Sequence, residues 1–104
     1  MTKIVGLTDS RFTATSAQQL ASLVETVADP HRLRILALLS AGEMTIRDIT
    51  ARLPIAQPTV THHVLKLQAA GLVTKRRAGV FMVCTLVPGV LASVSDALHP
   101  DGAR

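Results

Sequence analysis

Apolar residues recur at the three- and four-residue spacing of a helix in the first part of the chain. Ser16 can cap this helix, which is predicted to end near Ala28. A second helix is predicted from Asp29-Pro30, because Asp caps helices and Pro suits the first helical position. Its segment HRLRILALLS is apolar on almost every side, which indicates a central buried helix. The inward positions of these two helices are Ala17, Leu20, Ala21, Val24, Val27, Leu33, Leu36 and Leu39, with Ile35 and Leu38 as an alternative set in the second.

Two further helices follow in the middle of the chain. Gly42 ends the second helix, and Thr45 can cap a short third helix, TIRDITARL. Pro54 ends that helix, and Pro58 lies in the first turn of the next, which continues through VTHHVLKLQAA to Gly71. The inward positions of the third helix are Ile46, Ile49 and Leu53. The pattern predicts two short helices joined by a tight turn over residues 45–70.

After Gly71 the hydrophobic period changes to the alternation of strands. The segments LVTKRR and VFMVCTL flank Ala78-Gly79, which predicts a two-stranded antiparallel hairpin. Pro88 then opens a last helix whose apolar residues are Val90, Leu91, Val94, Ala97 and Leu98. The predicted order is α-α-α-α-β-β-α, a mainly α fold with one small hairpin.

The 104 residues have the length of one domain. We expect residues 1–15 to form a flexible arm, 16–99 the domain itself, and 100–104 a frayed end. No window reaches the roughly 18 consecutive apolar residues of a membrane span, and MTKIVGLTDS lacks the apolar core of a secretory signal, so a cytoplasmic protein without membrane contact is expected. The single cysteine, Cys84, is interpreted as an ordinary strand residue.

Charge is distributed unevenly along the chain. The net charge is +4, and residues 49–95 contain no Asp or Glu. A basic stretch of this kind attracts a polyanion, and nucleic acid is the usual one. The alternative is an ordinary solvated surface. The basic residues of the stretch are Arg52, Lys66, Lys75, Arg76 and Arg77.

The helix pair at residues 45–70 suits a helix-turn-helix, whose second helix presents small polar side chains to base edges in the major groove. Gln can pair with adenine, and Thr can bond or place its methyl group against thymine. Val60, Val64 and Leu67 lie on the other side of this helix and would anchor it to the core. Such helix pairs also occur in proteins that never bind DNA. The candidate DNA contacts on this helix are Gln57, Pro58, Thr59, Thr61, His62, His63 and Lys66, with both histidines open to a packing role.

Three basic residues cluster where the predicted hairpin turns. Lys75, Arg76 and Arg77 could contact phosphates, which would supply affinity and register with little sequence information. A hairpin edge protected from aggregation by its charge is the alternative.

With these motifs in this order, the sequence resembles the ArsR/SmtB family over roughly residues 17–98. The segments that carry the resemblance are ADPHRLRILALL, QPTVTHHVLKLQAAGLV and KRRAGVFMVCTL. The resemblance implies a winged helix-turn-helix regulator that binds a palindromic operator as a homodimer through its first and last helices. Leu65 and Lys66 are exchanged relative to the family pattern, and Val80 replaces a common Arg in the wing. The expected dimer contacts are Leu20, Val24, Val27, Val90, Val94 and Leu98.

Many members of this family respond to a transition metal, and two family metal sites can be compared with this sequence. A cysteine site on the helix before the recognition helix would fall on Thr45 to Arg47, and a site on the last helix would begin at Pro88 and Val90. Neither position holds a ligand. Asp96 and His99, three residues apart, remain as candidate ligands for zinc or nickel. Because neither family site has its ligands, we expect that the protein requires no cofactor.

An enzyme is not expected, because the chain has no Gly-rich phosphate loop and no nucleophile with a nearby base. The alternatives to a DNA-binding regulator are a winged-helix dimer that docks an accessory protein, and a metal-responsive sensor with a non-standard site.

Overall fold

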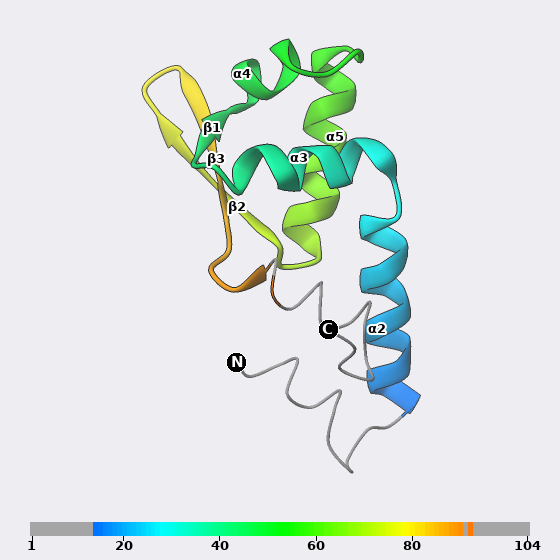
Figure 1. Ribbon diagram of the computed structural model, residues 1–104. Coiled ribbons are helices and arrows are strands. Elements are labelled where there is room, and N and C mark those ends of the chain that lie inside the picture. Colours follow the sequence, from blue (N-terminus) through cyan, green and yellow to red (C-terminus); the bar gives the residue numbers. More distant parts are fainter. Residues whose placement is uncertain (1–13, 91, 93–104) are drawn as a thin grey trace. The chain divides into compact units, whose positions relative to one another are not determined.

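The computed structural model describes residues 14–90 and 92. Its elements are α2 (Ala14–Val27), α3 (Pro30–Leu39), β1 (Met44–Thr45), α4 (Ile46–Ala51), α5 (Gln57–Ala69), β2 (Val73–Ala78) and β3 (Phe81–Leu86) (Figure 1). The chain divides into two compact units, and the unit from Thr26 to Val87 contains every element from α3 to β3. The second unit contributes most of α2 to the described residues.

The local signals for helix starts are confirmed at α3 and α4. The Asp29 carboxylate accepts hydrogen bonds from the backbone N–H groups of His31 at 2.8 Å and Arg32 at 3.0 Å, and Pro30 occupies the first turn of α3. Thr45 Oγ1 accepts the N–H of Asp48 at 3.0 Å and caps α4. Each cap satisfies backbone donors that the helix itself leaves unpaired.

The start of the first helix differs from the prediction. It begins at Ala14, so Ser16 lies inside α2 and is not its cap. Ala14 has a high helix propensity, which allows the helix to extend before the apolar periodicity begins. The arm predicted at residues 1–15 lies mostly outside the described residues, as do the end at 100–104 and the last helix beyond Val90, which itself has helical geometry.

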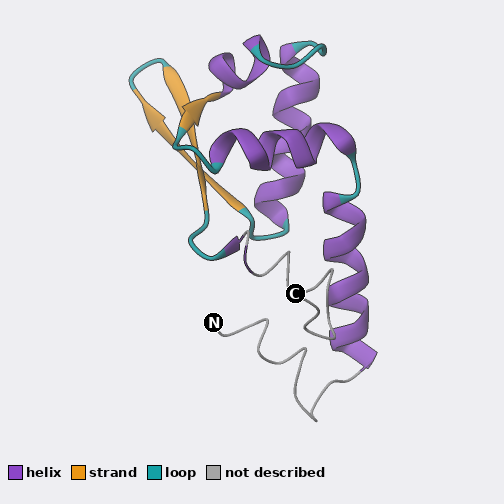
Figure 2. Cartoon of the chain, viewed as in Figure 1, coloured by secondary structure: helices purple, strands orange, loops and turns teal. Residues whose placement is uncertain are grey.

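The predicted hairpin is confirmed, and a third strand joins it. Ala78 pairs with Phe81, so the turn consists of Gly79 and Val80 and lies one residue later than predicted. Gly79 has φ +65°, the left-handed geometry that the first residue of a type II′ turn requires. The missed strand is β1, which pairs antiparallel with β3 in the order β1-β3-β2 (Figure 2).

The core of the unit is aliphatic and lies between the sheet and α3, α4 and α5. The inward positions predicted for α4 are buried, as are Leu36 and Leu39 of α3. Leu33 is exposed, so α3 is covered on one side only and not all round as predicted. The side chains with almost no accessible surface are Ile35, Leu36, Ile49, Val60, Val64, Leu67, Val73 and Cys84.

Candidate nucleic-acid interface

Helix α5 divides into a buried and an exposed side. Val60, Val64 and Leu67 have no accessible surface and fasten the helix to the core, as the spacing predicted. The side chain of Thr61 is half-buried. The exposed candidates are Gln57, Pro58, Thr59, His62 and Lys66. The structure therefore brings six of the seven candidates on α5 to accessible positions.

His63 is the exception, because its side chain is buried. Its side chain is only 8% exposed, and its Nδ1 lies 3.2 Å from Nη1 of Arg32 on α3. Successive residues on a helix point about 100° apart, so His63 turns inward where His62 turns outward. Of the two roles considered for His63, packing is the one that its burial supports, because the ring has almost no surface left for a base edge.

The beginning of α5 has no side-chain cap. Ala56 occupies the N-cap position and has no side-chain acceptor, although its carbonyl oxygen accepts the N–H groups of Thr59 at 3.0 Å and Val60 at 3.1 Å. The first N–H groups of a helix carry partial positive charge and are suited to an anion. Pro58 lies in this first turn, where its missing N–H costs no helical hydrogen bond.

The basic cluster of the hairpin is split between the two faces of the sheet. Side chains alternate along a strand, so Lys75 and Arg77 point to one face of β2 and Arg76 to the other. Lys75 is half-buried, and Arg76 and Arg77 are exposed. The three candidate phosphate contacts therefore do not all lie on the same face of the hairpin.

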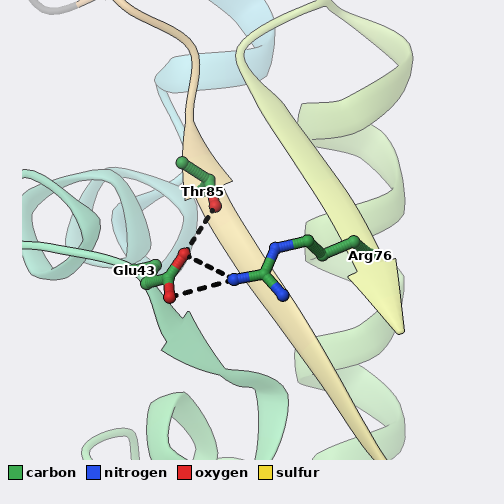
Figure 3. A network of polar contacts seen from close by, with 3 residues as sticks. All are labelled: Glu43, Arg76 and Thr85. Carbon is green, nitrogen blue, oxygen red and sulfur yellow. Dashed lines mark hydrogen bonds and ion pairs between the residues drawn. The ribbon is translucent and has the colours of Figure 1, made fainter. Parts of the chain in front are cut away.

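Arg76 forms an ion pair that sequence reasoning missed. Its Nη2 lies 3.0 Å from both carboxylate oxygens of Glu43, and Thr85 Oγ1 donates to Glu43 Oε1 at 3.5 Å (Figure 3). The two charged side chains are 56% and 53% exposed, so water screens their attraction. Glu43 directly precedes β1, and that strand brings it across to the hairpin.

Cys84 is confirmed as a strand residue. It lies in β3 with no accessible surface. Burial raises the pKa of its thiol, and the nearby positive charge of Lys75 opposes that rise only in part. The thiol is therefore protonated and shielded at neutral pH.

The two family metal positions do not fit metal ligands. Thr45 Oγ1 is occupied as the cap of α4, and Arg47 is an exposed cation. Pro88 and Val90 carry no ligand atoms in their side chains. Among residues 14–90 and 92, no group of three or more His, Cys, Asp or Glu side chains could hold a metal ion. Asp96 and His99 lie outside the described residues.

The candidate dimer residues differ in the surface that they leave open. Leu20 and Val24 on α2 are half-buried, whereas Val27 and Val90 are buried within one chain. A residue already buried in its own chain offers little surface to a partner. Val94 and Leu98 lie outside the described residues.

In the part of the chain that is described, no helix has the length and apolar content needed to cross a bilayer.

A short positioning helix, a second helix with one polar face and a basic hairpin define the class of winged helix-turn-helix domains. The family model for "Bacterial regulatory protein, arsR family" matches residues 29–75.

Relatives with known names support the same class. The arsenical resistance operon repressor of Staphylococcus xylosus is 39% identical over 64 residues, which are 62% of this chain and 62% of that protein, less than two thirds of its length. The transcriptional repressor SdpR of Bacillus subtilis is 34% identical over 67% of this chain and 78% of its own. A crystal structure of a possible transcriptional regulator for arsenical resistance has a TM-score of 0.70 and 32% identity, covering 78% of this chain and 84% of that one. The chain belongs to the arsR family of bacterial transcriptional regulators.

Proposed function

We propose that this protein regulates transcription by placing the exposed side of α5 in the major groove of a specific duplex. The observation that carries this proposal is the division of α5 into two sides. Val60, Val64 and Leu67 fix the helix in the core, while Gln57 and Thr59 stand exposed at its beginning. Short polar side chains on a rigid helix can distinguish bases by their hydrogen-bonding edges.

The hairpin would lie along the DNA backbone beside this groove. Arg77 is exposed near the turn and is suited to a phosphate, and half-buried Lys75 could contribute from the same face. Arg76 lies on the opposite face and is held by Glu43 in the free protein. In the first turn of α5, Pro58 has no N–H and the N–H of Thr59 bonds to the Ala56 carbonyl, so the N–H of Gln57 is the one that could reach a further phosphate.

A homodimer would present two copies of this surface to a palindromic operator. Of the candidate dimer residues that the structure describes, Leu20 and Val24 on α2 keep apolar surface for a partner. Val94 and Leu98 complete the stripe expected from the sequence. We propose that the protein acts in the cytoplasm and that it has no catalytic role, the latter because the family is described as one of regulatory proteins.

Metal control through the two family positions is not part of this proposal. Thr45 serves as a helix cap and Arg47 carries a positive charge, so a thiolate-type site there lacks its ligands. The name of one relative concerns arsenical resistance, but the side chains of Thr45 and Arg47 supply no thiolate at this family position. Any metal response would depend on Asp96 and His99, or on ligands not yet identified.

The deciding experiment selects duplexes from a random library with the purified protein. We expect one sequence pattern to be enriched, with an affinity that falls steeply between about 50 and 200 mM salt. Gln57→Ala and Thr61→Ala should lower discrimination at the base pair touched by ~1–3 kcal/mol. Arg77→Ala should weaken selected and scrambled duplexes alike. Poor binding to every duplex at low salt would instead favour a protein-interaction module.

A further inference from the structure

Arg32 joins three segments of the unit from Thr26 to Val87. Its Nε donates to the carbonyl oxygen of Thr26 at 2.6 Å, at the end of α2. Its Nη1 lies 3.2 Å from Nδ1 of His63, on α5. Its own backbone N–H bonds to the capping carboxylate of Asp29, at the start of α3. One side chain therefore links the central helix of the core to the helix proposed to read DNA.

The chemistry of the two groups determines the direction of the bond on α5. A guanidinium has five N–H donors and no acceptor, so Nδ1 of His63 must accept. The ring is then neutral and carries its proton on Nε2. Burial lowers the pKa of His63, and the positive charges of Arg32, His31 and His62 lower it further, while Asp29 acts in the opposite direction. A neutral ring at pH 7 agrees with this requirement.

The bond differs in kind from the other contacts that hold α5. Val60, Val64 and Leu67 are fastened by apolar packing, which has little directional preference. The Arg32–His63 hydrogen bond is directional, and it acts one residue away from His62 and two from Thr61. A small rotation of α5 about its axis would preserve much of the apolar packing but move those side chains relative to a base edge.

We propose that Arg32 is a positioning residue for DNA recognition: anchored on the Thr26 carbonyl, its guanidinium holds neutral His63 and so sets the rotation of α5 in the groove. This role depends on the DNA contact proposed above for α5. The proposal assigns a role in DNA recognition to a residue that does not itself contact DNA. It also gives a reason for a buried histidine among the exposed candidate DNA contacts of α5.

The test compares two duplexes, one selected by the unmodified protein and one of the same composition in scrambled order. In Arg32→Lys a single ammonium keeps the charge but cannot bridge both partners at once. We expect its affinity for the selected duplex to fall about tenfold, with less than about twofold change on the scrambled duplex. Arg34→Lys, an exposed position on the same helix, is the matched control and should change neither affinity. His63→Asn keeps an acceptor near the place of Nδ1 and should retain most of the discrimination, whereas His63→Phe should lose it.

A pH series separates positioning from general stability. The groups around His63 that titrate or carry charge are Asp29, His31 and Arg32 at the start of α3, and His62 on α5. Protonation would place a donor on Nδ1 opposite the Arg32 donor. The ratio of selected to scrambled affinity should therefore fall from about pH 7.5 to about pH 5.5 in the unmodified protein and stay level in His63→Asn. His31 and His62 are present in both proteins, so their titration does not create this difference.

The outcomes are distinct. If Arg32→Lys lowers the affinity for both duplexes in proportion to the folded fraction of the variant, measured by thermal unfolding, Arg32 is only a structural residue and the inference is wrong. It is also wrong if nitrogen NMR shifts of His63 show the proton on Nδ1 at neutral pH, a measurement that needs no DNA. If the library yields no preferred sequence, the proposed function itself fails, and the positioning role fails with it.

Discussion

The ion pair between Glu43 and Arg76 leads to a quantitative prediction about the wing. Each side chain is more than half exposed, so the pair should contribute only ~0–1 kcal/mol to stability. Glu43→Gln should therefore leave the free energy of unfolding within about 1 kcal/mol of the original value. Its main effect is to release the guanidinium of Arg76 for another partner.

The magnitude on DNA follows from counterion release. Each additional phosphate neutralised by a cation makes the slope of log affinity against log salt more negative by about 0.9. If Arg76 turns to a phosphate once Glu43 is neutral, Glu43→Gln should steepen the slope by that amount for each wing bound. The assay is duplex binding at several salt concentrations between about 50 and 200 mM.

Glu25→Gln is the matched control, because it removes the same charge from an exposed position on α2. A general charge effect would move both variants equally. In the double variant Glu43→Gln with Arg76→Gln, the additional slope should disappear. An unchanged slope in Glu43→Gln, or an equal change in Glu25→Gln, would refute the idea that Glu43 restrains a phosphate contact.

Four further predictions concern stability, assembly and regulation. Leu67→Ala removes a side chain with no accessible surface, so denaturant unfolding should show a loss of about 2–5 kcal/mol. The pKa of His63 is lowered in the folded protein, so the unfolded chain binds more protons below about pH 6.5. The contribution of neutral His63 to the free energy of unfolding should be fully present above that pH and should be lost as the pH falls through the folded pKa. This decline should be smaller in His63→Asn. Val24→Asp should convert the expected dimer to a monomer in sedimentation, and a monomeric unmodified protein at micromolar concentration would contradict the proposed interface. Zinc or nickel should change operator affinity by less than about tenfold, and a larger effect abolished by His99→Ala would assign the site to the last helix.

Much of the framework was predictable from neighbouring residues. The cap at Asp29 bonds to groups two and three residues later, and Thr45 bonds to the N–H three residues later. The hairpin follows from alternation on both sides of Gly79, and the period of Val60, Val64 and Leu67 indicated which side of α5 enters the core. The family resemblance was visible for the same reason, since its motifs are short and ordered.

The tertiary structure decided the features that depend on distant partners. β1 is two residues long, and its strand geometry comes from pairing with β3, about 40 positions later. The Glu43–Arg76 pair joins residues 33 positions apart, and the Arg32–His63 pair joins residues 31 apart. Local periodicity contains no information about such long-range contacts, because they depend on how the elements pack. The sequence alone therefore determined the helices from α2 to α5, the hairpin and the family, whereas packing decided that His63 turns inward and that Arg76 is held on the opposite face from Arg77.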